Sequence, residues 1–316
     1  MTYLVTGGTG AIGCKIVNIL AEQGQQVIVY DLLPAGSLLE ELLSKEQGAR
    51  VKILQGDVTD LPHLIHTVKK NRVEKIIHMA SPLVDRANTN PLLALKGICE
   101  GTINVFETAK IFELKKVVWA SSVVVFGPPE KYPGEYIPND ALYYPWGVYG
   151  ACKALNEVLA DNYSENYGLD ITGIRYTTVY GPATVRGFTG AFVRELMANP
   201  ALGRPGRVPL GDAMISWLYV EDAARATVLV AQSPRTKTRA FTISGDVRQV
   251  RKAAEYVRML LPEADITVIG GSVPISSKFE TTAIEQEVGY YRKWSIEQGF
   301  RETINAIRQQ HGLPPV

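Results

Sequence analysis

A tyrosine and a lysine four positions apart, Tyr149 and Lys153, lie inside a strongly helical stretch of the sequence. This spacing places both side chains on one helix face, with their Cβ atoms about 5–6 Å apart. A free tyrosine has a pKa of about 10 and is a poor base at neutral pH, but a neighbouring ammonium group favours the phenolate. The pair is therefore a candidate for proton exchange with a substrate hydroxyl group.

Two serines, Ser121 and Ser122, stand at the end of an apolar run that is typical of a buried strand. Ligands of open α/β sheets bind at the carboxyl ends of the strands. A serine hydroxyl at this position would donate a hydrogen bond to a substrate oxygen beside Tyr149.

A glycine-rich segment joins the first expected strand to the first expected helix. It contains Gly7, Gly10 and Gly13, with Ala11 and Ile12 between the last two. Glycines in this setting allow a tight turn and a close approach of the backbone to a pyrophosphate, which then meets the amino-terminal end of the helix. The segment predicts a dinucleotide-binding site.

The second expected strand ends at Asp31. A carboxylate there accepts hydrogen bonds from both ribose hydroxyls and repels a 2′-phosphate, which favours NAD over NADP. The other residues expected to bind the cofactor follow the third and fourth strands: Asp57, Val58, Met79, Ala80 and Ser81. Asp57 has an alternative interpretation as a residue at a helix amino terminus, and His78, in an apolar run, is expected to be structural.

These residues are placed by an alternation of short apolar runs and longer amphipathic stretches. The expected strands are Tyr3–Thr6, Gln26–Asp31, Val51–Gln55, Lys75–Met79, Lys116–Ser121 and Asp170–Tyr176, and the expected helices include Ala11–Gln23, Leu61–Lys70, Pro91–Phe112 and Trp146–Tyr167. Such a series predicts an α/β fold with a doubly wound parallel sheet of Rossmann type. We expect residues 1–176 to form the dinucleotide-binding domain and residues 177–316 a smaller substrate-binding region, partly interleaved with it.

The bulk composition excludes several classes of protein. The chain has 33 Lys and Arg against 32 Asp and Glu, so no basic field exists to attract nucleic acid or anionic lipid. The three cysteines are scattered, which favours a reducing compartment and argues against a metal site or a disulfide framework. No apolar run approaches the roughly 20 residues needed to span a bilayer, and we find no signal peptide, so a cytoplasmic location is expected.

These motifs together resemble the extended short-chain dehydrogenases/reductases of the NAD-dependent epimerase/dehydratase superfamily. The resemblance covers nearly the whole chain and rests on Thr6–Gly13, Gly101-Thr102, the Ser-Ser pair before Phe126-Gly127, Tyr149 with Lys153, Tyr180-Gly181-Pro182, Val220-Glu221-Asp222 and Gly289-Tyr290. It implies that Ser122 is the catalytic serine and Ser121 its structural neighbour, with a shift by one residue as the alternative. It also implies that Lys153 holds the cofactor ribose and that Tyr149 lies against the cofactor.

The chain departs from the family pattern at five positions. Dehydratases carry an Asp-Glu pair directly after the catalytic serine or threonine, where this chain has Val123 and a second valine, so dehydration is not expected. Nucleotide-sugar epimerases carry an Asn where Thr178 stands and a diphosphate-binding Arg where Ile215 stands. An apolar side chain cannot neutralise a diphosphate, so we expect a substrate without one. Ile98 replaces an Asn that many members have behind the Tyr/Lys pair.

The residues expected to contact the substrate are Leu83, Val123, Thr178, Arg186 and Trp217. Arg186 is a candidate partner for a substrate carboxylate, and its alternative interpretation is a solvated loop residue. Trp217 has the alternative of a core position.

The resulting interpretation is an NAD-dependent oxidoreductase that transfers a hydride between nicotinamide and a secondary alcohol or ketone of a small substrate, such as a hydroxy acid or a sugar-derived compound. Tyr149 exchanges the hydroxyl proton, Lys153 lowers its pKa and Ser122 stabilises the substrate oxygen. The alternatives are a sugar epimerase that retains its NAD and a catalytically silent NAD-binding protein. The resemblance further implies a homodimer, with Val105, Phe106, Ala109, Leu155 and Leu159 as candidate interface residues.

Overall fold

The computed structural model of the chain describes residues 1–33, 38–184 and 186–316. Its centre is a seven-stranded sheet in the order β10-β6-β5-β4-β1-β2-β3, in which every neighbouring pair is parallel. The strands of this sheet are β1 (Thr2–Thr6), β2 (Gln26–Asp31), β3 (Val51–Gln55), β4 (Lys75–His78), β5 (Lys116–Ser122), β6 (Ile171–Tyr176) and β10 (Ala240–Ile243). The predicted Rossmann-type fold is thereby confirmed.

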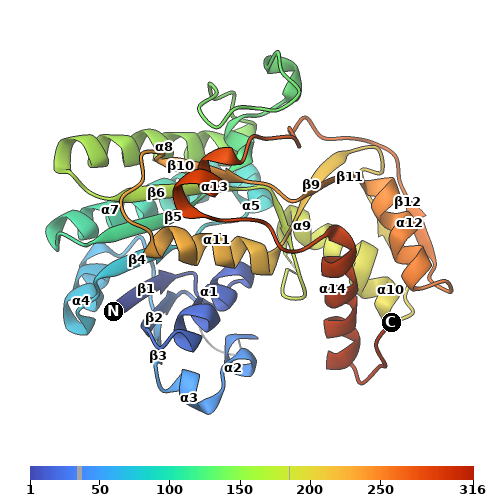
Figure 1. Cartoon of the computed structure of the whole chain (residues 1–316), viewed down its shortest axis with the longest axis horizontal. Coiled ribbons are helices and arrows are strands. Elements are labelled where there is room, and N and C mark those ends of the chain that lie inside the picture. The colour runs from blue at the N-terminus through green and yellow to red at the C-terminus, as the bar shows by residue number, and fades with distance from the viewer. Residues whose placement is uncertain (34–37, 185) are drawn as a thin grey trace.

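Helices cover both faces of this sheet (Figure 1). The helices of the first two-thirds of the chain are α1 (Ala11–Glu22), α2 (Leu38–Leu42), α3 (Lys45–Gly48), α4 (Leu61–Asn71), α5 (Val84–Thr89), α6 (Pro91–Ala94), α7 (Gly101–Ile111), α8 (Gly147–Tyr167), α9 (Gly187–Phe192) and α10 (Asn199–Ala201). Those that follow are α11 (Val220–Gln232), α12 (Val250–Leu260), α13 (Thr282–Val288) and α14 (Ile296–Gln310). One apolar cluster joins α1 and α11 to one face of the sheet, and another joins α4, α7 and α8 to the opposite face.

Two segments of the second half of the chain, α11 and β10, pack into the core that the first half forms. Strand β10 pairs with β6 at the edge of the large sheet, and α11 packs against α1. The alternating pattern of the first half did not reveal β10. Its four residues, AFTI, form a short apolar run with no helical periodicity around it, so nothing in the local sequence ties it to a sheet that ended some sixty residues earlier.

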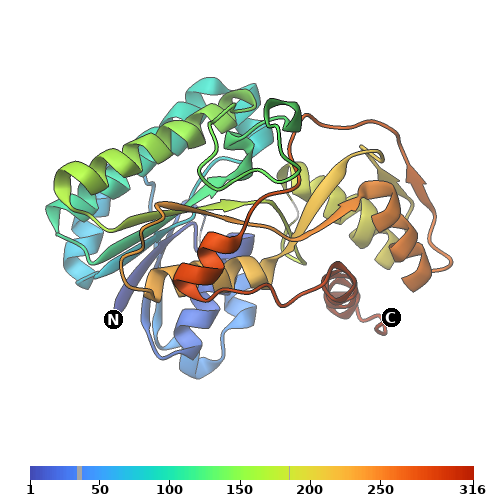
Figure 2. The same cartoon turned by 45° about the horizontal axis from the view of Figure 1, so that its top comes forward.

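A smaller lobe lies beside the carboxyl ends of the core strands (Figure 2). It is built on two small sheets, with strand orders β11-β9-β7 and β12-β8. Their strands are β7 (Thr178–Tyr180), β8 (Gly206–Val208), β9 (Met214–Tyr219), β11 (Asp246–Gln249) and β12 (Ile266–Val268). An aromatic core that contains Tyr180, Trp217 and Phe300 holds this lobe together through edge-to-face contacts.

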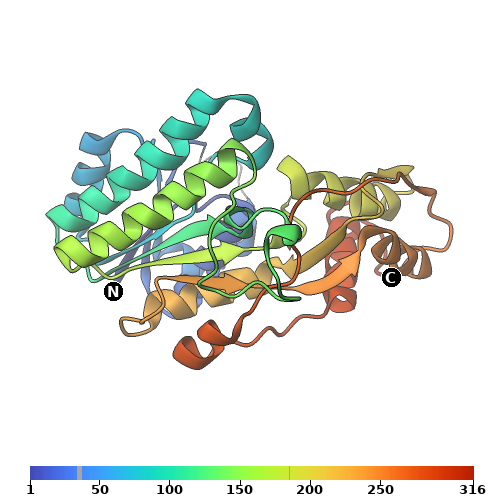
Figure 3. The same ribbon diagram turned by 90° about the horizontal axis from the view of Figure 1, so that it is seen from above.

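The long helix predicted over Pro91–Phe112 is divided into three parts. Between α6 and α7 the chain forms a π-helical turn, Leu95–Glu100. Such turns widen the helix by one residue and frequently occur at functional sites. Figure 3 shows α7 and α8 side by side on the outside of the core, and the π-helical turn also packs against α8.

Three residues predicted for a dimer interface lie elsewhere. Val105, Phe106 and Ala109 are each 0% exposed and belong to the cluster beneath the sheet, so this part of the prediction was wrong. The physical reason is that the apolar stripe of α7 faces the sheet, and periodicity alone does not distinguish a core-facing stripe from an outward-facing one. Among the described residues, no helix combines the length and the hydrophobicity that crossing a bilayer requires.

Candidate active site

The glycine-rich segment forms a backbone cradle that has no room for side chains. Gly7 has a φ of +66°, and a Cβ atom there would lie 2.7 Å from the backbone nitrogen of Ala80. A Cβ on Gly13 would lie 2.1 Å from the carbonyl oxygen of Gly7. Gly10 precedes α1, and no side chain caps this helix. The amino-terminal N–H groups of α1 therefore face a cradle suited to the pyrophosphate of a dinucleotide.

Asp31 is held in position at the end of β2. The backbone N–H and the hydroxyl group of Thr9 donate to Asp31 Oδ2 over 3.1 and 2.6 Å. This orients the carboxylate at the mouth of the glycine-rich segment, where the adenosine ribose of a dinucleotide would lie. Sequence reasoning missed Thr9, although its position inside the glycine-rich segment was a signal for such a contact.

The fixed carboxylate leads to a prediction on cofactor choice. NAD should bind at least about tenfold more tightly than NADP, a difference of about 1.4 kcal/mol, because a 2′-phosphate would meet the charge of Asp31. Titration calorimetry with both cofactors measures this ratio. Asp31→Ser should remove most of the preference, and equal or tighter binding of NADP by the unmodified protein would contradict the assignment.

The residues after β3 form a tight turn ahead of α4. Asp57 Oδ1 accepts a hydrogen bond from the N–H of Thr59 at 2.8 Å, while the helix cap of α4 is provided by Asp60. Val58 is buried, and its side chain lies 2.7 Å from where a Cβ atom on Gly101 would be. Asp57 therefore forms a local turn and is not the cap of α4.

The segment after β4 lies directly beneath Gly7. The N–H of Met79 donates to the carbonyl of Thr6 at 3.0 Å, and the N–H of Ala80 donates to the Thr6 hydroxyl at 3.3 Å. Ser81 follows, and its hydroxyl donates to the carbonyl oxygen of Pro82 at 3.1 Å. The two bonds to Thr6 hold Met79 and Ala80 against the glycine-rich segment, and Ser81 follows them after the carboxyl end of β4.

Ser122, Tyr149 and Lys153 meet where β5 ends and α8 begins. The Ser122 hydroxyl is hydrogen-bonded to Tyr149, and Lys153 Nζ lies 5.5 Å from the centre of the Tyr149 ring. Lys153 is buried and donates to the carbonyl oxygen of Ala120 at 2.6 Å. The ammonium group is therefore held behind the phenol ring, and the phenol oxygen is directed toward Ser122.

Burial disfavours the charged forms of both Tyr149 and Lys153. It raises the pKa of Tyr149 to about 12, and the hydrogen bond from Ser122 acts in the opposite direction. It lowers the pKa of Lys153 to about 8, although the negative charge of the nearby Glu157 carboxylate acts in the opposite direction. Without the cofactor, the phenol is therefore neutral at pH 7, and proton transfer requires a further positive charge beside it.

The backbone at the start of α8 is capped by a residue from another helix. Asn88 Oδ1 accepts a hydrogen bond from the N–H of Tyr149 at 3.0 Å, and no side chain of α8 itself caps this end. Tyr149 thus lies in the first turn, where the helix dipole favours a negative charge. Sequence reasoning missed Asn88, because 61 positions separate it from Tyr149 and no local motif marks the contact.

The two serines at the end of β5 have different surroundings. The hydroxyl of Ser121 donates to Glu157 Oε1 at 2.5 Å. The same carboxylate accepts from Tyr143 and forms a buried ion pair with Arg175, whose Nη2 lies 2.6 Å from Glu157 Oε2. Ser121 therefore anchors the strand end to a buried polar network, whereas Ser122 turns toward Tyr149.

A second network of buried hydrogen-bonding side chains lies behind the site. The number of protons that its side chains can donate determines the direction of each hydrogen bond. The Thr102 hydroxyl donates its single proton to the carbonyl of Ile98 at 2.6 Å, so it must accept from His78 Nε2 at 3.2 Å. His78 Nδ1 then accepts from the Thr6 hydroxyl at 2.6 Å. Burial lowers the pKa of His78 to about 3, with the charge of Lys153 adding to the effect. His78 is therefore a neutral structural link between the glycine-rich segment and the π-helical turn.

Asn156 completes this network from the catalytic helix. Its Nδ2 donates to the Ile98 carbonyl and to the Thr102 hydroxyl, each at 3.0 Å. The family pattern has an amide side chain at position 98, where this chain has Ile98. Here Asn156 brings a buried amide group to the same turn from α8.

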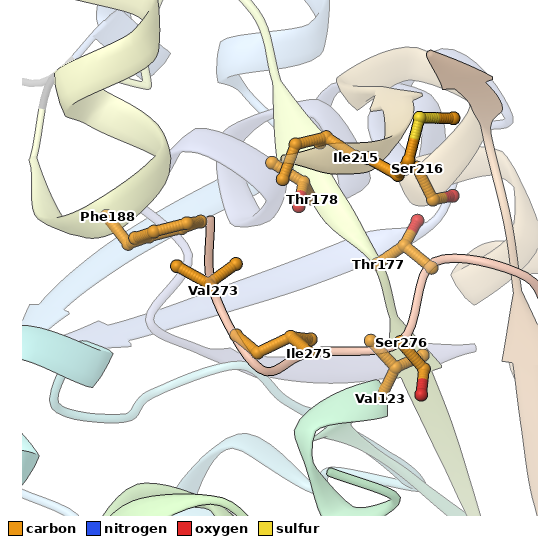
Figure 4. Close-up of a pocket in the computed structure, with 10 residues that line it drawn as sticks. Val123, Thr177, Thr178, Phe188, Ile215, Ser216, Val273, Ile275 and Ser276 are labelled. Carbon is orange, nitrogen blue, oxygen red and sulfur yellow. The ribbon is translucent and has the colours of Figure 1, made fainter. Parts of the chain in front are cut away.

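A pocket opens beside Ser122, between the core and the smaller lobe (Figure 4). Ten described residues line it: Val123, Thr177, Thr178, Phe188, Met214, Ile215, Ser216, Val273, Ile275 and Ser276. Val123 directly follows Ser122, and Thr177 directly follows Tyr176, the register partner of Ser122. The pocket is therefore continuous with the catalytic end of β5.

Of the five residues predicted to contact the substrate, Val123 and Thr178 line this pocket and three do not. Trp217 is 1% exposed in the aromatic core of the smaller lobe, and its indole N–H donates to the carbonyl of Arg248 at 3.2 Å. Arg186 is exposed at the start of α9, and Leu83 is exposed at the start of α5. Trp217 is thus a core residue that does not line the pocket. Arg186 also lies outside the pocket lining.

Known proteins share both the sequence pattern and the fold of this chain. An uncharacterized protein of Methanocaldococcus jannaschii is 29% identical over 185 residues, which is 56% of each chain, so the match spans about half of that relative. A UDP-glucuronate 4-epimerase of Thermodesulfobacterium geofontis is 26% identical over 325 residues, or 96% of this chain and 95% of the relative.

Two solved structures show the same fold. The UDP-glucose 4-epimerase of Thermus thermophilus in complex with NAD gives a TM-score of 0.86 at 24% identity, covering 98% of this chain and 99% of that one. A partial consensus L-threonine 3-dehydrogenase gives a TM-score of 0.87 at 22% identity, covering 98% and 100%. The sequence profile of the NAD dependent epimerase/dehydratase family matches residues 3–244. The chain, with its NAD cradle and its Ser122, Tyr149 and Lys153 arrangement, belongs to the NAD dependent epimerase/dehydratase family.

Proposed function

We propose that the protein oxidises a secondary-alcohol carbon of its substrate and, in its physiological cycle, reduces the same carbon again as an epimerase. The observation that carries the oxidation step is the meeting of Ser122, Tyr149 and Lys153 beside the glycine cradle. NAD, when bound, supplies the hydride acceptor. Tyr149 takes the hydroxyl proton, Ser122 donates a hydrogen bond to the substrate oxygen, and Lys153 favours the phenolate.

The epimerase cycle is supported by the comparisons more than net oxidation is. The sequence interpretation placed a dehydrogenase first, but a UDP-glucuronate 4-epimerase is among the relatives that match nearly the whole chain. Structures of both epimerases and threonine dehydrogenases share the fold, so the fold alone does not separate the two reactions.

One experiment distinguishes the two reactions. The protein is incubated with NAD and single stereoisomers of secondary alcohols and sugar derivatives. An epimerase should invert a stereocentre without accumulating free NADH, whereas a dehydrogenase should release one NADH for each ketone formed. Stoichiometric NADH release without inversion would contradict the epimerase cycle and leave the oxidation step in place.

The pocket supports a substrate without a diphosphate group. Ile215 and Val123 are buried in its wall, and none of its described lining residues carries a charge. A diphosphate placed there would lose its hydration without gaining a partner. We therefore expect no detectable binding of UDP-glucose in titration calorimetry, and binding with a micromolar dissociation constant would contradict this part of the proposal.

The proton chemistry predicts a characteristic pH dependence. Alcohol oxidation requires the Tyr149 phenolate, so kcat/KM for oxidation should rise with pH from neutral into alkaline solution, and ketone reduction should fall over the same range. Lys153→Met removes the cation that favours the phenolate and should move the rising limb upward by about 1–3 pH units. Rate profiles in both directions measure this shift, and an unmoved limb would argue against the role of Lys153.

The outer surface of α6, the π-helical turn and α8 is proposed as a homodimer interface. Its exposed apolar residues are Leu92, Leu95, Leu155 and Val158. Light scattering should show a dimer at micromolar concentration, and replacing Leu155 and Val158 together by Glu should convert it to a monomer because both charges would be buried on pairing. A monomeric unmodified protein would refute the proposal, and Met259→Glu, at an exposed residue of α12, is the matched control.

A further inference from the structure

Helix α8 begins with a backbone turn that is shaped around the side chain of Asn88. Gly147, the first residue of α8, has a φ of +69°, which residues with a side chain rarely adopt. A Cβ atom on Gly147 would lie 2.7 Å from Asn88 Oδ1 and 2.9 Å from Asn88 Nδ2. The same Oδ1 accepts a hydrogen bond from the N–H of Tyr149 at 3.0 Å. The amide group of Asn88 therefore occupies the space that the glycine leaves open and caps the helix from outside.

The same turn is fixed on its other side to the strand end that carries Ser122. The N–H of Trp146 donates to the carbonyl of Val124 at 3.1 Å. Val124 belongs to the short 3₁₀ turn that directly follows Ser122. The position of Tyr149 relative to Ser122 therefore depends on a contact on each side of the helix start, one with this turn and one with Asn88.

Helix α5, which carries Asn88, is itself held between the core and the smaller lobe. Ala87 is 0% exposed and packs in an apolar cluster that includes Cys152 of α8. At the other end of α5, Leu83 Cδ1 lies 3.1 Å from where a Cβ atom on Gly187 would be, at the start of α9. Asn88 therefore has little freedom to move away from the start of α8.

An amide group suits this position because it accepts a hydrogen bond without carrying a charge. An aspartate caps a helix as well as an asparagine does. A carboxylate at position 88 would contact the N–H of Tyr149 and would therefore lie within about 10 Å of the phenol oxygen of the same residue, where it would disfavour the phenolate. Proton transfer at Tyr149 requires that phenolate, so a neutral cap preserves the chemistry that an acidic cap would oppose.

We infer that Asn88 is a positioning residue for proton transfer at Tyr149. Its neutral amide group fixes the amino-terminal end of α8, and with it the phenol beside Ser122, without adding a negative charge near the group that must ionise. The inference rests on the proposed function, in which Tyr149 takes the proton of the substrate hydroxyl. The other titratable side chains on the surrounding elements stay the same in every variant below: Lys153 and Glu157 on α8, Cys99 and Cys152 in the apolar cluster, His78 in the network behind the site, and Asp85 and Arg86 on α5.

The test replaces Asn88 by Asp and by Ala, with the same two replacements of Asn90 as matched controls. Asn90 Oδ1 accepts a hydrogen bond from the N–H of Leu93 at 3.1 Å, so it caps α6 in the way that Asn88 caps α8. Each replacement removes or charges one helix cap, but only those of Asn88 act on the helix that carries Tyr149. Denaturant unfolding and calorimetry with NAD establish that all four variants fold and bind the cofactor.

Ionisation of the phenol is measured directly in the NAD complex by NMR. In protein whose tyrosines carry an NMR-active carbon label at Cζ, the resonance of Tyr149 follows its titration, and Tyr149→Phe assigns that resonance. Asn88→Asp should move the titration midpoint upward by roughly 0.5–1.5 pH units, the size expected for a carboxylate within about 10 Å. Asn90→Asp should leave the midpoint unchanged. Equal midpoints in Asn88→Asp and the unmodified protein would overturn the inference.

Kinetics with a secondary alcohol that the unmodified protein converts separates positioning from charge. Asn88→Ala should lower kcat by about 10- to 100-fold at every pH, because the phenol is no longer held where proton transfer requires it. Asn88→Asp keeps the hydrogen-bond acceptor, so its kcat should reach that of the unmodified protein, but only at more alkaline pH. A kcat of Asn88→Ala as high as that of Asn90→Ala, per NAD-binding molecule, would show that Asn88 is a helix cap alone and would overturn the inference.

The titration requires no substrate, so the inference and the proposed function can fail separately. If no alcohol is oxidised or inverted but Asn88→Asp moves the titration of Tyr149, the placement of Asn88 at the phenol is retained and the proposed function is contradicted. If alcohols are converted and the Asn88 variants behave as the Asn90 variants do, the proposed function is retained and the role of Asn88 is contradicted.

Discussion

Replacing Tyr149 by Phe should lower turnover by at least about two orders of magnitude, the usual scale of general acid–base catalysis. The substitution removes only the phenol oxygen. Lys153 keeps its bond to the Ala120 carbonyl, and the N–H of residue 149 keeps its bond to Asn88. NAD binding and the free energy of unfolding should therefore remain close to those of the unmodified protein.

The measurement compares kcat for a secondary alcohol that the unmodified protein converts with NAD affinity from calorimetry. Tyr167→Phe is the matched control, because Tyr167 ends the same helix and is exposed. Ser122→Ala should cost less than Tyr149→Phe, since it removes one hydrogen bond and leaves the proton acceptor. Lys153→Met should impair both turnover and NAD binding. Retention of most activity by Tyr149→Phe would show that another group moves the proton.

Replacing Arg175 by Met should destabilise the fold by about 3–5 kcal/mol, the range for breaking one side of a buried ion pair. Arg175 and Glu157 are each 3% exposed. Arg175 donates to both oxygens of that carboxylate and, through Nη1, to the carbonyl of Asn139 at 2.6 Å. Methionine would leave the Glu157 charge buried with only the hydroxyls of Ser121 and Tyr143 as partners.

Denaturant unfolding measures this loss, with Lys252→Met as the control. Lys252 pairs with Glu255 at 2.9 Å on the surface of α12, where both side chains are largely exposed, and such pairs contribute about 1 kcal/mol or less. Equal effects of the two substitutions would contradict the importance of the buried pair. Because Glu157 also binds Ser121, the Arg175 variant should lose activity more than its remaining folded fraction accounts for.

The cofactor-binding part of this protein could be predicted from local sequence patterns. The Gly7, Gly10 and Gly13 spacing, followed by a strand that ends at Asp31, predicted an NAD site. The alternation of short apolar runs with amphipathic stretches predicted the Rossmann-type sheet, and both are confirmed. The reason is that each of these features acts within a few residues of its own position. A tight turn requires glycine locally, and a four-residue spacing fixes the common face of Tyr149 and Lys153 in any helix.

Contacts between distant segments were decided only by the tertiary structure. Asn88 reaches the first turn of α8, Asn156 reaches the turn at Ile98, and β10 returns to the core sheet. None of these has a local signature, because each depends on how separate elements pack. The same is true of Trp217 and Phe106, whose large apolar side chains suit a pocket wall, a subunit interface or a core equally well. Burial of Trp217 and Phe106 to 1% and 0% exposure followed from which face of the strand or helix met its neighbours, and only the assembled fold determines that face.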